Sequence, residues 1–315
     1  MIDPHFLSLL RCPDCGQGRL AVCGDELACR NCPAHFPLAG HRPVMLRHGN
    51  SLFAIDAYSS ATPDARMSRQ GPGRFIPSPS VNLAAKRVLV HLAATLDARS
   101  PSDILIVGGG CQRAWLDPIL RANAEPRVLY SDIDIGADVD LFCDGHDLPF
   151  VDGAFDAVVT TAVLEHVMYP ERVAGEITRV LKPGGLLYSE MPFMQQVHEG
   201  AYDFTRYTLS GHRRLFNGFD ELDAGMVAGP ATALVWSIEN LALALVTGRT
   251  ARKIAKASVR LVFGWIKYLD HFLEKRPEAM DGASCTYFFG AKATHPVDDA
   301  EIIRRYVGGK HFSHV

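Results

Sequence analysis

The feature that most constrains the fold is the alternation of strand-like and helix-like segments from Asp103 onward. Short runs of branched apolar residues, the first being "DILIV", are each followed by a stretch whose apolar residues have helical spacing. Strands that alternate with helices in this way form a parallel sheet covered by helices. The sequence therefore predicts an α/β domain over residues 81–295, with a Rossmann-like sheet and helices on both faces.

Composition limits what surrounds this domain. With 315 residues, 48% of them hydrophobic, the chain can bury one large core with something small attached. Asp and Glu number 35 against 32 Lys and Arg, so no overall charge attracts nucleic acid. The N-terminus has an acid at Asp3 and too short an apolar run for a secretory signal, which predicts a cytoplasmic protein.

Two Cys-x-x-Cys pairs, separated by thirteen residues, stand in the first fifty residues. Each pair can turn two thiolates toward one point, and the two together predict a closed tetrathiolate site for structural zinc. The expected zinc ligands are Cys12, Cys15, Cys29 and Cys32.

Residues 1–50, including "FPLAGHRPVML", resemble the Trm112-like zinc ribbons, a family that includes activating partners of methyltransferases. This segment has five arginines, four acidic residues and no lysine, which is too little positive charge to predict nucleic-acid binding. We therefore expect a docking or folding role. Residues 51–80 are dense in Ser, Pro and Gly and are predicted to be a linker.

The strand "DILIV" breaks into three glycines, Gly108–Gly110, which indicates that the backbone approaches a ligand there. A dinucleotide-binding turn would need a further glycine where Arg113 stands. Asp132 ends the second strand, where a carboxylate can accept hydrogen bonds from ribose hydroxyls, and Asp144 ends the third, where it can accept from an adenine amine. These residues predict a nucleoside site without a pyrophosphate.

Residues 103–193 resemble the class I S-adenosylmethionine-dependent methyltransferases of the type 11 kind. The resemblance rests on "GGG", "SDID", "DGHDLPFVDGAFDAVV", "LEHV" and "RVLKPGG" in this order. It implies S-adenosylmethionine as the cofactor, with glycines beside its methionine part, one acid at the ribose, a second acid at the adenine amine and further residues beside the base. The residues so implied are Gly108, Gly109, Gly110, Asp132, Asp144, Gly145, His146 and Leu148.

Some of these assignments have competitors. Asp134 competes with Asp132 for the ribose, and Asp144 could instead cap a turn. Two positions depart from the family: Ile106 stands where an acid is usual, and Gln112 where a glycine is usual. A catalytically degenerate, cofactor-binding scaffold is therefore an alternative to an enzyme.

Methyl transfer requires an acceptor aligned with the sulfonium and, for oxygen, removal of a proton. In the segment "MPFMQQVHEGAYDFTRYT" we expect His198 to be the general base and Arg206 and Tyr207 to bind the acceptor, with His166 of "LEHV" as second candidate. The alternative is that Asp203 and Arg206 merely order this loop. We expect O-methylation of a small molecule or glycan; an RNA methyltransferase that holds its substrate with the ribbon is the second hypothesis.

A basic helix is predicted near the C-terminus, because residues 246–269 hold six lysine or arginine residues and no acidic residue. Its apolar residues gather on the opposite side, so that face should lie on the protein or at a membrane interface. Either the basic face, residues 249–267, is simply solvated, or it binds an anionic partner such as a membrane surface. We expect residues 221–280 to form a helical insertion that caps the acceptor pocket, and 296–315 to form a tail. The bases are Arg249, Arg252, Lys253, Lys256, Arg260 and Lys267, and the apolar residues are Ile254, Leu261, Val262, Trp265 and Leu269.

Overall fold

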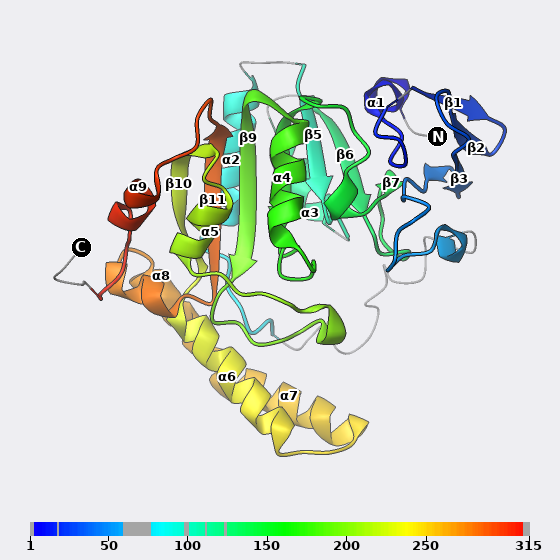
Figure 1. Cartoon of the computed structure of the whole chain (residues 1–315). Helices are drawn as coiled ribbons and strands as arrows, with labels where there is room; N and C mark the ends of the chain where they lie inside the picture. Colours follow the sequence, from blue (N-terminus) through cyan, green and yellow to red (C-terminus); the bar gives the residue numbers. More distant parts are fainter. Residues whose placement is uncertain are drawn as a thin grey trace.

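The computed structural model describes residues 3–17, 19–58, 77–97, 101–110, 112–122 and 125–310. Most of the predicted linker, residues 59–76, and the end of the predicted tail, residues 311–315, lie outside the described residues. Figure 1 shows a small N-terminal unit beside one edge of a large sheet, and a helical hairpin that extends away from the sheet.

One sheet of seven strands forms the centre of the molecule: β5 (Asp103–Val107), β6 (Arg127–Asp132), β7 (Leu141–Phe142), β8 (Phe155–Thr161), β9 (Leu181–Pro192), β10 (Phe219–Ala228) and β11 (Cys285–Lys292). Their order is β10-β11-β9-β8-β5-β6-β7 (Figure 1). Neighbours from β7 to β9 are parallel, while β11 is antiparallel to both β9 and β10. The first strand of this sheet along the chain, β5, lies inside the sheet. The next strands, β6 and β7, lie on one side of it, and β8 and β9 lie on the other, so the strand order reverses between β5 and β8. This confirms the predicted Rossmann-like sheet.

Side chains of β5 alternate between two cores on opposite faces of the sheet. Leu105 and Val107 lie in the core that includes helix α4 (Pro170–Val180) and the end of α5 (Leu209–Leu215). Ile104 and Ile106 lie in the core formed with α2 (Ala85–Asp97) and α3 (Arg113–Leu120). Because both faces are covered, all five residues of β5 are buried, and after Asp103 the strand has the uninterrupted apolar sequence of a parallel sheet.

The N-terminal unit is a helix followed by a four-stranded antiparallel sheet: α1 (Pro4–Leu9), β1 (Leu20–Cys23), β2 (Glu26–Cys29), β3 (His35–Ala39) and β4 (Arg42–Pro43). Its buried Phe6 and Leu10 belong to the same core as Phe155 of the large sheet. Beyond β4, Val44 bridges Phe142 of β7 in parallel. The unit is therefore packed against the large domain and covers the edge of its sheet.

Residues 51–58, predicted as linker, pack against the large domain instead. They end in a 3-10 turn, η1 (Ile55–Tyr58), in which Tyr58 is buried. The Tyr58 hydroxyl donates a 2.6 Å hydrogen bond to the carbonyl of Ile133, next to the end of β6. The Tyr58 side chain therefore holds this segment against the large domain, and the Ser, Pro and Gly content of the segment did not predict this.

Helices fill the chain between β10 and β11. The prediction of an insertion over 221–280 was wrong at its start, because residues 219–228 pair with β11 and form strand β10. The inserted elements are α6 (Pro230–Ala244), α7 (Arg249–Phe263), η5 (Ile266–Leu269), α8 (Asp270–Leu273) and η6 (Pro277–Gly282), and α9 (Asp299–Arg304) lies in the predicted tail.

Candidate functional site

A cavity of about 1110 Å³ opens at the carboxyl ends of β5, β6 and β8, and continues along the loop after β7. Open parallel sheets bind ligands at this edge, next to the point where the strand order reverses. Residues 52–58 supply part of its wall. The cavity is lined by Gly108, Asp132, Asp134, Asp144, Gly145, His146, Val163, His166 and His198, among others.

The glycine turn after β5 requires glycine at its first position. Gly108 has φ 71°, and a Cβ built there would lie 2.2 Å from Cγ2 of Val163. Gln112, where the family usually has glycine, does not line the cavity. Its amide accepts a 2.6 Å hydrogen bond from Thr161 Oγ1 and donates to the Thr161 carbonyl, so the side chain ties the turn to the end of β8. The departure at Gln112 therefore leaves the turn open to a ligand.

Two neighbouring carboxylates follow β6 at the cavity wall. Asp132 accepts hydrogen bonds from the backbone N–H groups of Gly110 at 2.7 Å, Ile133 at 2.7 Å and Asp134 at 3.0 Å. Burial raises the pKa of Asp132, with these N–H groups acting in the opposite direction. Asp132 thus fixes the glycine turn directly, while Asp134 lines the same wall.

Asp144 begins the turn η3 (Gly145–Asp147), as the capping alternative expected, and it also lines the cavity. It accepts from the N–H of His146 at 2.9 Å, lies 2.6 Å from His146 Nδ1, and accepts from Asn50 Nδ2 at 2.8 Å. Burial acts to raise the pKa of Asp144, but the His146 and Asn50 hydrogen bonds outweigh it and lower this pKa. Leu148 lies in the core and does not line the cavity.

The two predicted histidines meet above the cavity. The rings of His166, after β8, and His198, after β9, have centroids 4.8 Å apart. Beneath them lies Glu165, whose side chain is 1% exposed and whose Oε1 is 3.6 Å from His166 Nε2. Burial raises the pKa of Glu165 to about 8. Burial also lowers the pKa of His166, although its hydrogen bond to the Tyr202 carbonyl acts in the opposite direction.

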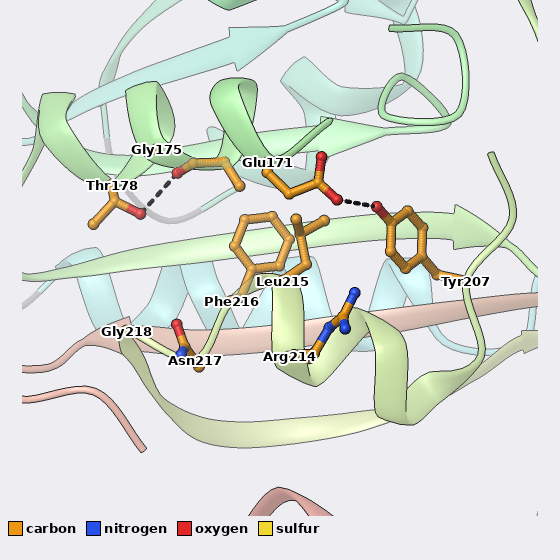
Figure 2. Close-up of a pocket in the computed structure, with 10 residues that line it drawn as sticks. Glu171, Gly175, Thr178, Tyr207, Arg214, Leu215, Phe216, Asn217 and Gly218 are labelled. Carbon is orange, nitrogen blue, oxygen red and sulfur yellow. Dashed lines mark hydrogen bonds between the residues drawn. The ribbon is translucent and has the colours of Figure 1, made fainter. Parts of the chain in front are cut away.

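Arg206 and Tyr207, predicted to bind the acceptor, lie elsewhere. Arg206 pairs with Asp203, which is 1% exposed, and donates to the carbonyls of Gln195 and Gln196. Tyr207 faces a separate groove of about 440 Å³ between α4 and α5, where its hydroxyl lies 3.0 Å from Glu171 Oε1 (Figure 2). Neither residue lines the cavity: Arg206 orders the loop that carries His198, as the alternative expected, and Tyr207 lines the separate groove.

The four predicted zinc ligands come together. One sulfur from each cysteine lies within 4.8 Å of the others. The Sγ atoms of Cys12 and Cys32 are 3.7 Å apart, and those of Cys15 and Cys29 are 3.8 Å apart. Cys23 lies outside this cluster and is exposed.

The predicted basic segment forms α7 and, after it, the turn η5, which holds Lys267 and Leu269. Arg260 pairs with the buried Glu239 of α6 at 2.6 Å, Lys256 lies 3.5 Å from the same carboxylate, and Lys267 is buried. The apolar residues are instead exposed: Leu261 by 69% and Trp265 by 61%, with Ile254, Val262 and Leu269 also exposed. The apolar face therefore does not lie on the protein. In the part of the chain that the structure describes, no helix is long and apolar enough to span a membrane.

The helical insertion does not cap the cavity as predicted. The residues that line the cavity all precede α6. Near the cavity, the insertion contacts the loop that carries His198: Gln196 Nε2 donates to Ser237 Oγ at 2.8 Å, and the Trp236 ring lies 6.3 Å from that of His198.

Asn50 and Glu165 were missed by sequence reasoning. Glu165 stands beside His166 inside "LEHV", so an acid in an otherwise apolar run was the available signal. Nothing in the sequence connects Asn50 to Asp144, because 93 residues separate them and only docking of the N-terminal unit brings them together.

The strand order and the cavity at the reversal point define the catalytic fold of class I methyltransferases. Residues 120–189 match the family described as methyltransferase domain, Methyltransf_11.

Among curated proteins, the ubiquinone/menaquinone biosynthesis C-methyltransferase UbiE of Neisseria gonorrhoeae is 31% identical over 139 residues, which is 39% of this chain and 56% of that protein. An uncharacterized methyltransferase of Mycobacterium sp. strain KMS is 29% identical over 130 residues, 38% of this chain and 51% of its own length. The chain thus spans about half the length of these relatives.

Solved structures of similar fold include a complex that contains the Haloferax volcanii Trm112 methyltransferase activator, with 19% identity, TM-score 0.40, and coverage of 66% of this chain and 89% of that one. A phosphoethanolamine N-methyltransferase 2 of Haemonchus contortus has 14% identity and TM-score 0.40, and covers 65% of this chain and 52% of its own.

Proposed function

We propose that this chain transfers a methyl group from S-adenosylmethionine to an oxygen atom of a small molecule or glycan. The observation that carries the proposal is the cavity in which a glycine turn meets three carboxylates, Asp132, Asp134 and Asp144. In the reaction the acceptor O–H and sulfonium S–CH3 bonds break, and an O–CH3 bond forms. S-adenosylhomocysteine and a proton are released.

The residues around the cavity fit this cofactor. Its methionine part would lie along Gly108–Gly110, its ribose at Asp132 or Asp134, and its adenine amine at Asp144, with Gly145 and His146 beside the base. Asp132 already accepts three backbone hydrogen bonds, and a carboxylate has about four acceptor sites. If Asp134 holds the ribose, Asp134→Asn weakens cofactor binding in calorimetry without lowering the unfolding temperature, whereas Asp132→Asn lowers both.

The acceptor is activated, in this proposal, by the histidine pair above the cavity. Both rings line the cavity, and general bases act on protons within direct reach. In its simplest form the role is proton removal by His198, with His166 orienting the acceptor. Turnover of His198→Ala close to that of the parent would remove this residue from the mechanism.

Isotope-labelled S-adenosylmethionine tests the reaction. Incubated with the enzyme and a cell extract, it should label a small molecule or glycan detectable by mass spectrometry, and Asp144→Asn should abolish the label. Label in RNA would instead favour the RNA methyltransferase. Cofactor binding without label in any fraction would favour the non-catalytic scaffold.

We propose that the N-terminal cysteine cluster binds structural zinc. Tetrahedral zinc with bonds of about 2.3 Å to sulfur separates its ligands by about 3.8 Å, and the measured sulfur pairs lie at 3.7 and 3.8 Å. The ribbon buries Phe6 and Leu10 in the shared core, which favours a structural role over RNA binding.

We propose that the exposed apolar face of α7 rests on an anionic membrane surface. Arg249 and Lys253 are exposed on the opposite side of the helix, so the segment has an apolar face and a basic face, as interfacial helices do. Sedimentation with vesicles of anionic phospholipid should capture the protein, and Leu261→Ser with Trp265→Ser should release it. Leu222→Ser, an exposed leucine on β10, is the matched control. A dimer in solution that the same pair of substitutions dissolves would assign the face to a second copy.

A further inference from the structure

Three potential metal ligands meet in the wall of the proposed cofactor cavity. Glu165 and His166 follow β8, and His198 comes from the loop after β9. One ligand atom from each lies within 4.8 Å of the other two. The group is separate from the cysteine cluster, which belongs to the N-terminal unit.

The Glu165 carboxyl group is buried without a hydrogen bond from another residue. Its side chain is 1% exposed, and neither oxygen accepts a hydrogen bond from another residue in the described part of the chain. His166 Nε2 lies 3.6 Å away, beyond hydrogen-bond distance. Because buried polar groups without a hydrogen-bond partner are unfavourable, this position favours a ligand.

In both histidines the Nδ1 atom is hydrogen-bonded to a backbone carbonyl. His166 Nδ1 lies 2.7 Å from the carbonyl of Tyr202, and His198 Nδ1 lies 3.2 Å from the carbonyl of Gln196. A carbonyl only accepts, so each Nδ1 carries the proton and each Nε2 has a free lone pair. Metal-binding histidines are commonly oriented by such a hydrogen bond from the other ring nitrogen.

The loop that carries His198 is held in place by Asp203 and Arg206. The buried Asp203 accepts a 2.8 Å hydrogen bond from the His198 N–H and pairs with Arg206. These contacts hold the backbone that carries the His198 ring.

We propose that Glu165, His166 and His198 bind a divalent first-row transition cation at the cavity wall. Two imidazoles and one carboxylate are ordinary ligands of such ions, and three protein ligands leave coordination positions open. With bonds of about 2.0–2.2 Å, the ligand atoms need to approach one another by about 1 Å.

The inference rests on the proposed function and revises the part played by the histidines. His166 and His198 line the cavity in which the methyl acceptor would lie, so a cation held by them would be within reach of the acceptor. A cation there binds the acceptor oxygen and makes its proton easier to lose. His166 and His198 then hold the cation, and solvent takes the proton.

Manganese binding to the full chain tests the site directly. After dialysis against a chelator, Mn²⁺ titration followed by electron paramagnetic resonance should show one bound ion per chain. Glu165→Gln and His198→Gln should each weaken binding at least tenfold. Glu274→Gln and His295→Gln, both exposed and remote from the cluster, should leave it unchanged.

Thermal unfolding of the metal-free variants separates ligation from folding. Glu165→Gln should unfold within a few degrees of the parent, because the amide has the shape of the carboxyl group and replaces a side chain that accepts no hydrogen bond from another residue. Mn²⁺ binding that survives both ligand substitutions would overturn the site, as would no Mn²⁺ binding in a parent that binds S-adenosylmethionine. Mn²⁺ binding in a parent that does not bind S-adenosylmethionine would leave the site standing and end the proposed function.

Discussion

Asn50 Nδ2 donates a 2.8 Å hydrogen bond to Oδ2 of Asp144, which joins the end of the N-terminal unit to the loop after β7. The same unit shares its apolar core with the large sheet. The wall of the cavity is therefore built from both parts of the chain. A substitution in the N-terminal unit should therefore change the affinity for the cofactor.

Asn50→Ala should weaken cofactor binding about tenfold. A hydrogen bond to a charged group contributes about 1.5–3 kcal/mol, and its loss leaves Asp144 free to turn away from the adenine. Calorimetry with S-adenosylhomocysteine measures the effect. Asn31→Ala, an exposed asparagine of the same unit, should bind as the parent does, and equal affinity in all three proteins would contradict the role of Asn50.

Gly108→Ala should abolish measurable cofactor binding and lower the unfolding temperature by several degrees. Its φ of 71° disfavours any side chain by about 1–2 kcal/mol, and the new Cβ would also meet Val163 at 2.2 Å. Gly24→Ala is the matched control, because Gly24 has φ 64° with open space around it. The comparison isolates the contact with Val163, and equal effects of the two substitutions would argue against a tight turn.

Cys15→Ser should reduce bound zinc from one ion per chain to none and destabilise the protein. Loss of the metal would loosen Phe6 and Leu10, which belong to the shared core. Elemental analysis and thermal unfolding give the two readouts. Cys23→Ser, which alters an exposed cysteine outside the cluster, should retain both zinc and stability.

His212 should make stability depend on pH. Burial, followed by the nearby Arg213, lowers the pKa of His212 to about 3, against about 6.5 in an unfolded chain. As pH falls below about 6.5 the unfolded state takes up the proton first, so the stability present above that pH is lost toward pH 3, at about 1.4 kcal/mol per unit.

Denaturant unfolding at about pH 7.5 and about pH 5 measures this loss. His212→Gln should lose about 2 kcal/mol less than the parent between these conditions. His295→Gln, at an exposed position, should behave as the parent does. An unchanged pH dependence in His212→Gln would contradict the assignment.

The sequence predicted the parts of the molecule that depend on local pattern. The run "DILIV" and the later strand-like runs predicted a parallel sheet, and the two Cys-x-x-Cys pairs predicted a closed cysteine cluster. Helical periodicity likewise separated the two faces of α7. It could not say which face points inward, because that depends on Glu239 of another helix, which pairs with Arg260.

The site was predictable only where its residues follow strands. Gly108, Asp132 and Asp144 occupy the expected edge because the ends of parallel strands meet there. Tyr207 was misassigned because its direction depends on packing against α4, where it meets Glu171. Such long-range contacts have no signature in the spacing of residues.

Binding of S-adenosylmethionine to the purified chain is the most direct test of the central claim. Calorimetry should give one site with a dissociation constant in the micromolar range, weakened at least tenfold by Asp144→Asn. No heat of binding at millimolar S-adenosylmethionine, in protein shown to be folded, would contradict it.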